Sequence, residues 1–286
     1  MKPRLRRTAY VALVSGAAVL GAAPAANSGT LNDNYWGGID TLTPSGGDVI
    51  GPSLFNITSA DITRINNGQI LQVTIYTAYA GAPGSPAADG TNYGSLFFAP
   101  TWNPAGLAPY STDVYQPNEW TKAFVTTSST TGGLYSTGQV QTKNDYFNNG
   151  TDTGVAQSYT TTTGTIVMSN VHGDPVTYPT PGNPGFYFRQ GQAVRFDPTA
   201  PQLDGGSWSV NPGVSITYLI NDSGSLGNSF AMSWAMDCAN DVIQGWVSVP
   251  GPIAGAGFPG ALLATGGLLA LWRTRQRKSS STARFS

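Results

Sequence analysis

The sequence predicts an all-β fold, an antiparallel β-sandwich or jelly roll, for residues 27–249. Thr, Tyr, Val, Gly, Asn and Pro abound there, whereas charged residues that favour helices are scarce, and Glu119 is the single glutamate among the 15 acidic residues. Branched and aromatic side chains favour strands, and Gly and Pro favour turns. No segment has the apolar spacing of a helix. Short strands separated by turns are typical of sandwiches rather than α/β folds.

The strands are expected in the following order. Leu71, Val73 and Ile75 alternate with other residues, which is the pattern of a half-buried strand. Before it, a turn at residues 58–61 is expected to separate the apolar segments 55–57 and 62–65. Loops are expected at 81–93, 100–117 and 144–154. Further strands are expected at 95–99, 120–126, 134–142, 159–168, 207–209, 214–220, 230–236 and 242–249, with a hairpin at 186–196.

Residues 1–26 have the pattern of a secretory signal peptide. A basic region with Lys2, Arg4, Arg6 and Arg7 precedes an apolar segment at residues 10–20. This segment is too short to cross a bilayer as a helix. The small residues around position 24 predict cleavage near residue 25 or 26.

The C-terminal part, residues 250–286, has the pattern of a membrane anchor. No charged residue occurs from Pro250 to Trp272, and a helix over residues 253–272 would span roughly the 30 Å of a bilayer core. A buried core helix is the alternative, but such a helix would not normally end in a basic cluster. That cluster consists of Arg273, Arg275, Arg277 and Lys278. It predicts that residues 273–286 stay in the cytoplasm and that the preceding chain is exported.

A proline-rich hinge precedes the apolar segment and consists of Val249, Pro250, Gly251 and Pro252. Together the hinge, the uncharged segment and the Arg cluster resemble the PEP-CTERM sorting signal of Gram-negative bacteria, and residues 249–260 are similar to its VPxPIAGAGxPG variant. Gly251 stands where the Pro-Glu-Pro form has Glu. The resemblance implies export, transient anchoring in the inner membrane and recognition by an exosortase-type sorting enzyme. Such proteins are typically surface or matrix proteins of bacteria that make extracellular polysaccharide.

Residues 27–249 also resemble uncharacterised exported PEP-CTERM proteins. The similarity lies in a Tyr-Trp-Gly-Gly start at 35–38, an Asp-Val-Ile-Gly turn at 48–51 and a Cys-x-Asn-Asp-Val-Ile-x-Gly end at 238–245. This second resemblance implies no particular activity.

The charge of the chain is unevenly distributed. Residues 27–249 hold all 15 acidic residues but only five of the 14 basic ones, so their net charge is 5 − 15 = −10. A strongly acidic domain argues against nucleic acid and anionic lipid as partners. It is compatible with divalent cations or neutral sugars.

Two similar segments lie near opposite ends of this domain, Gly-Asp-Val-Ile-Gly at 47–51 and Asn-Asp-Val-Ile-Gln-Gly at 240–245. The similarity is either a coincidence or a sign that the first and last strands pair in one sheet. In the second case Asp33, Asp48, Asn240 and Asp241 converge. Ca²⁺ takes carboxylates, Asn side chains and loop carbonyls as ligands, so these four residues are the candidate calcium site. The alternative is that they cap loops as Asx turns.

Aromatic residues in or beside the Gly/Pro-rich loops suggest a second kind of site. They are Trp36, Trp102, Tyr110, Tyr115 and Trp120. Exposed together, such rings would stack on the C–H faces of sugars, so they are the candidate glycan-binding residues. Burial in the core is the alternative, because Trp is highly buried on average.

Catalysis is not expected. His172 is the only histidine and Cys238 the only cysteine, which excludes sites that need several of either, and no Gly-x-Ser-x-Gly motif is present. Glycoside hydrolysis needs two facing carboxylates, and the many aspartates alone do not indicate such a pair.

The sequence therefore predicts an exported cell-surface or matrix protein whose domain is a non-catalytic binding or adhesive module. The expected ligand is polysaccharide and the expected cofactor is stabilising Ca²⁺. The alternatives are a purely structural matrix component and a polysaccharide-acting enzyme.

Overall fold

The computed structural model describes residues 28–40, 48–50, 53–82, 92–147, 155–169 and 189–249. The predicted signal peptide, the sorting motif after Val249, the membrane span, the basic cluster and His172 lie outside these residues. In the part of the chain that the structure describes, no helix is long and apolar enough to cross a membrane. All of the described strands belong to one compact unit, Ala25–Pro252.

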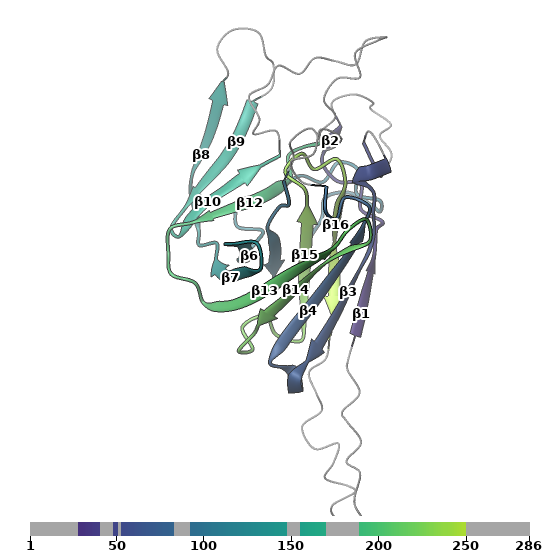
Figure 1. Ribbon diagram of the computed structural model, residues 1–286. Helices are drawn as coiled ribbons and strands as arrows, with labels where there is room; N and C mark the ends of the chain where they lie inside the picture. Colours follow the sequence, from purple (N-terminus) through teal and green to yellow (C-terminus); the bar gives the residue numbers. More distant parts are fainter. Residues whose placement is uncertain are drawn as a thin grey trace, which may run out of the picture. The chain divides into compact units, whose positions relative to one another are not determined.

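The described residues form antiparallel sheets without any α-helix (Figure 1). The largest sheet has ten strands in the order β1-β3-β4-β14-β13-β7-β6-β5-β15-β16, the second has four in the order β12-β10-β9-β8, and β11 pairs with β2. The strands are β1 (Ser28–Asn32), β2 (Ile39–Asp40), β3 (Ile57–Ile65), β4 (Ile70–Thr77), β5 (Leu96–Ala99), β6 (Lys122–Thr126), β7 (Thr131–Ser136), β8 (Val140–Phe147), β9 (Val155–Thr161), β10 (Gly164–Met168), β11 (Arg189–Gln190), β12 (Ala193–Pro198), β13 (Asp204–Asn211), β14 (Ser215–Asn221), β15 (Ser229–Ala235) and β16 (Val242–Ser248). Two short 3₁₀ turns, η1 (Ser53–Phe55) and η2 (Asn66–Gly68), flank β3. The predicted all-β antiparallel class is therefore confirmed.

The large sheet nearly closes into a barrel. Its first and last strands, β1 and β16, lie side by side, because the Cβ that a side chain would add at Gly245 meets Leu31 of β1 at 2.6 Å. A sandwich would have two packed sheets of similar size. Here ten strands of one sheet enclose one apolar interior. Leu71, Val73, Ile75, Tyr218 and Trp234 are fully buried there.

The four-stranded sheet covers part of the outer face of the large one. Along β5, Leu96 and Phe98 point into the interior, whereas Phe97 and Ala99 pack with Phe196 of β12 in a second core. Successive side chains of a strand point to opposite faces of a sheet, so one strand serves both cores. This explains why all four residues of β5 are buried.

Some local predictions differ from the structure. Residues 58–61 are not a turn but the middle of β3, where Asp61 accepts hydrogen bonds from Thr30 on β1 (2.8 Å) and Tyr76 on β4 (3.1 Å). Cross-strand partners thus override the local turn preference of Ser, Thr and Asp. Within the expected hairpin at 186–196, the described residues 189–196 do not pair with one another, because β11 pairs with β2 and β12 with β10.

Candidate metal centre

Three aspartates from distant parts of the chain meet at one end of the large sheet. Asp33 follows β1, Asp48 lies in the segment before β3, and Asp241 precedes β16. One carboxylate oxygen from each lies within 4.8 Å of the others. Three of the four predicted calcium ligands therefore lie together, and we call them the aspartate trio.

Asp241 is fixed in place by the backbone. It is completely buried, and its two oxygens accept hydrogen bonds from the backbone N–H groups of Ile57 (2.6 Å) and Val242 (2.9 Å). One carboxylate thus links the start of β3 to the start of β16.

Asp33 and Asp48 lack comparable donors. Both carboxylate oxygens of Asp33 and Oδ1 of Asp48 are shielded from solvent and have no hydrogen-bond partner. Buried polar atoms nearly always have a partner, because desolvation without one is costly. These oxygens therefore require a group that the protein itself does not supply.

The electrostatic environment leads to the same conclusion. Burial, followed by the charges of Asp241 and Asp48, raises the pKa of Asp33 well above its ordinary value. The nearby backbone N–H of Tyr35 makes no well-formed hydrogen bond to Asp33 and offsets only part of this rise. Burial also raises the pKa values of Asp48 and Asp241, and the positive charge of Arg189 offsets only part of each rise. The three carboxylates thus face too little positive charge to be ionised together unless a cation binds. Without a cation, at least one of them keeps a proton.

Arg189 is the basic residue next to the trio. It is 2% exposed, and its guanidinium donates to the backbone carbonyls of Gly37 (3.1 Å) and Asp48 (2.6 Å). It thereby holds the loop on which Asp48 lies. No motif in the sequence marks Arg189. The available signal is its rarity, since it is one of five basic residues in residues 27–249.

Asn240, the fourth predicted ligand, has a different role in its described contacts. Its Nδ2 donates to the carbonyl of Ile50 (2.7 Å), and the backbone N–H of Ile50 donates to the Asn240 carbonyl (2.8 Å). The two similar Asp-Val-Ile segments thus lie together, but the expected pairing of the first and last strands does not occur among the described residues, where β1 pairs with β3 and β16 with β15. Asn240 is 1% exposed and its Oδ1 has no hydrogen-bond partner.

The aspartate trio suits a hard divalent cation. Ca²⁺ binds about six to eight oxygen ligands at about 2.3–2.6 Å, so any two of them lie no more than about 5.2 Å apart. Carboxylate oxygens that all lie within 4.8 Å of one another are therefore close enough to share one such ion.

The predicted glycan-binding aromatics separate into two groups. Tyr115 and Trp120 are 5% and 2% exposed in the core beneath the four-stranded sheet, so they are not available for stacking on a sugar. Trp36 is 36% exposed, and its backbone N–H binds the carbonyl of Pro109 (2.8 Å). Next to Pro109, Tyr110 is half-buried and meets the half-buried Trp102 edge to face at 5.1 Å.

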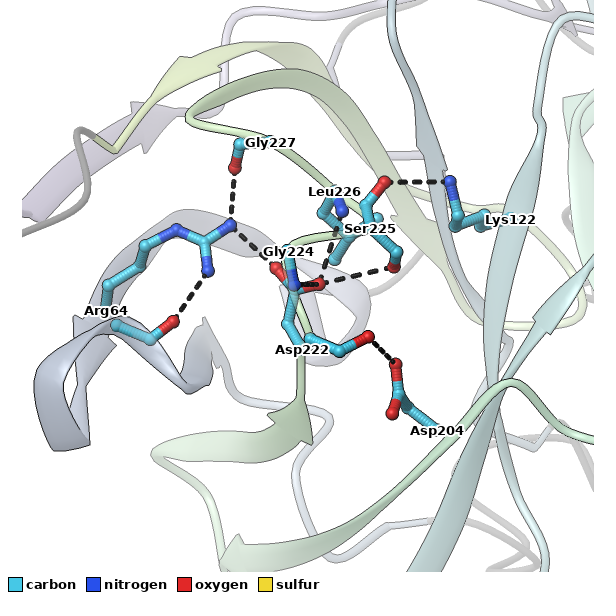
Figure 2. A network of polar contacts seen from close by, with 10 residues as sticks. Arg64, Lys122, Asp204, Asp222, Gly224, Ser225, Leu226 and Gly227 are labelled. Atoms are coloured by element: carbon cyan, nitrogen blue, oxygen red, sulfur yellow. Dashed lines mark hydrogen bonds and ion pairs between the residues drawn. The ribbon is translucent and has the colours of Figure 1, made fainter.

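A second buried carboxylate, Asp222, has all the partners that the trio lacks (Figure 2). Its Oδ2 pairs with Arg64 of β3 at 2.7 Å. Its Oδ1 accepts hydrogen bonds from the N–H groups of Gly224 (3.0 Å) and Leu226 (3.2 Å) and from the hydroxyl of Ser225 (3.2 Å). Arg64 also donates to the carbonyls of Gly68 and Gly227. We call this the Arg64–Asp222 network, and it binds the loop after β14 to β3.

Compared with known protein families, curated proteins and solved structures, the chain matches none. Function is therefore inferred from the residues of the chain and from the geometry of the aspartate trio.

Proposed function

We propose that residues 27–249 form an exported, non-catalytic surface domain that binds one divalent cation, calcium, at the aspartate trio. The observation that carries this proposal is the convergence of Asp33, Asp48 and Asp241 with buried oxygens that lack donors. A cation would neutralise the carboxylates and supply the missing partner. Because each ligand comes from a different segment, the ion would hold the fold together.

A calcium titration of the full chain in detergent tests this. We expect binding of one Ca²⁺ with a dissociation constant of about 10⁻⁴–10⁻³ M, the range of extracellular calcium modules. The free energy of unfolding should rise by about 2.7 kcal/mol at a calcium concentration 100 times that constant. Mg²⁺ should bind more weakly, because it demands near-ideal octahedral geometry and gives up its water reluctantly.

Two variants form a matched pair for this titration. Asp48→Asn removes a carboxylate of the trio that makes no hydrogen bond through Oδ1, and it should abolish binding. Asp61→Asn removes an aspartate on β3 that lies outside the trio, and it should leave binding intact. Absence of bound calcium and of any stabilisation at about 10 mM, above the weakest extracellular sites, would overturn the proposal.

Catalysis on a polysaccharide fits the trio poorly. A glycosidase presents its two carboxyl groups to a sugar that lies between them, whereas the oxygens of Asp33 and the Oδ1 of Asp48 are shielded from solvent.

Polysaccharide is the second candidate ligand, through binding rather than cleavage. The exposed ring of Trp36 supports this candidate, and the backbone of Trp36 contacts Pro109, the neighbour of Tyr110 in the chain. Retention of the full chain on the host's exopolysaccharide tests it: Trp36→Ala should reduce retention, while Trp246→Ala, at another exposed tryptophan, should not. Equal retention of both variants and the parent would leave a structural matrix component as the better description.

The C-terminal segment is proposed to act in sorting. Its resemblance to PEP-CTERM signals supports transient anchoring in the inner membrane and recognition by an exosortase-type enzyme at Val249–Pro252. Replacement of Arg273, Arg275, Arg277 and Lys278 by Gln should block correct anchoring, as shown by fractionation of cells.

A further inference from the structure

The strands at the two ends of the large sheet form a seam. β1 pairs only with β3 and β16 only with β15, and the order of hydrogen-bonded strands begins with one and ends with the other. They still touch: a Cβ built at Gly29 would lie 3.0 Å from the carbonyl oxygen of Ser248, and Gly245 lies against Leu31. β1 and β16 are thus in contact, but no backbone ladder joins them among the described residues.

The aspartate trio lies at one end of this seam. Asp33 directly follows β1, and Asp241 directly precedes β16. At the other end Gly29 lies against Ser248 and Val249, so the two strands run antiparallel. The trio therefore lies where a bound group would connect the end of β1 to the start of β16.

The three carboxylates are not equally free to move. Asp241 is held by two backbone N–H groups, and the backbone of Asp48 is held by Arg189. Asp33 has no donor for either oxygen. β1 pairs with β3 along its whole length but is attached to β16 by few side chains, since Leu31 is its single large apolar side chain and three of its five residues are exposed. An empty trio leaves the buried carboxyl of Asp33 without partners, which favours separation of β1 from β16. The ladder to β3 would then be the sole attachment of β1 among the described residues and would open more readily.

We propose that the cation acts as a latch that closes the seam, so that β1 is docked beside β16 only when the trio is occupied. This inference rests on the proposed function and adds a regulated element to it. Extracellular calcium modules respond at about 10⁻⁴–10⁻³ M, well above the 10⁻⁷–10⁻⁵ M of cytosolic sensors. A latch in the extracellular range would stay open inside the cell and close after export.

Hydrogen exchange of the full chain in detergent tests the latch. Amides of residues 29–33 should be protected about a hundredfold more at a calcium concentration 100 times the dissociation constant than in chelator, because opening would require release of the ion. Amides of β4 and β14, in the middle of the sheet, should change much less. Asp48→Asn should remove the response, and Asp197→Asn, at an exposed aspartate of β12 outside the trio, should keep it.

The outcomes separate the latch from the proposed function. If calcium binds but leaves the protection of residues 29–33 unchanged, or raises protection equally throughout the large sheet, the latch is wrong and the cation site stands. If calcium does not bind at all, both are wrong.

Discussion

Two groups of buried carboxylates in this domain are built in opposite ways. In the Arg64–Asp222 network both oxygens of Asp222 have partners, including a guanidinium that is itself buried (Figure 2). In the aspartate trio, Asp33 has no donor for either oxygen, and two further carboxylates lie beside it. A buried charge without partners is costly. The comparison therefore separates a carboxylate whose partners lie within the fold from carboxylates that have too few partners there.

The largest expected effect is in the complete network. Asp222→Ala leaves the guanidinium of Arg64 buried without its counter-charge and removes the acceptor of three hydrogen bonds in the following loop. Breaking a buried ion pair by removal of one partner costs about 3–5 kcal/mol. Urea unfolding should show this loss both with calcium and with chelator.

The control for this variant is Asp197→Ala, which breaks the exposed pair with Arg195. Exposed pairs contribute about 0–1 kcal/mol. A similar loss for the two variants would contradict the view that the Arg64–Asp222 network owes its strength to burial.

Removal of a carboxylate from the trio should have the opposite sign. In chelator near pH 7, folding of the parent requires proton uptake by Asp33, because burial raises the pKa of its carboxyl. Asn is neutral without binding a proton, so we expect the variant to be more stable than the parent. With calcium the order should reverse, because the variant has lost a ligand. Thermal unfolding in the two conditions gives both signs, and destabilisation in both would mean that Asp33 acts as an ordinary structural residue.

The pH dependence of the trio follows from its pKa values. Burial and neighbouring charges raise the pKa of Asp33 in the folded state, so the native protein keeps a proton that the unfolded chain releases near pH 4. Its contribution is complete below the unfolded pKa and is lost as the pH rises towards the folded one. In chelator, the stability of the parent relative to Asp33→Asn should thus fall by up to about 1.4 kcal/mol per pH unit above pH 4.

Calcium should reverse this dependence. The ion binds the ionised carboxylates, so in its presence the stability of the parent relative to Asp33→Asn should rise with pH over the same interval. Chemical unfolding of both proteins at several pH values measures the two slopes. Equal slopes with and without calcium would mean that protons and calcium do not compete at the trio.

The sequence allowed the fold class to be predicted but not the closure of the large sheet. Alternation at Leu71, Val73 and Ile75 predicts β4, because the period of a strand is local. The partner of β4 on one side is β14, more than 130 residues later in the chain. The turn-forming residues in β3 likewise predict a turn locally, whereas pairing with β1 and β4 makes the segment a strand.

The two carboxylate groups also differ in how visible they were in the sequence. The repeated Asp-Val-Ile pattern pointed to Asp48 and Asp241, and the structure places these residues together with Asp33. Nothing comparable marked Arg64 and Asp222, which are 158 residues apart and lie in dissimilar segments. An ion pair within a core has no local pattern, so only the folded chain reveals it.

The smallest expected effect tests whether the complete network contains spare donors. Ser225→Ala removes one of three hydrogen bonds to Oδ1 of Asp222 and leaves the N–H groups of Gly224 and Leu226 in place. An ordinary hydrogen bond contributes about 0.5–1.5 kcal/mol, and with two donors remaining we expect the low end. Ser223→Ala is the matched control, since that hydroxyl binds the exposed carboxylate of Asp204 at 3.1 Å, and it should change stability even less. A loss as large as that of Asp222→Ala would mean that each donor is essential, and that even a well-partnered buried carboxylate has no reserve.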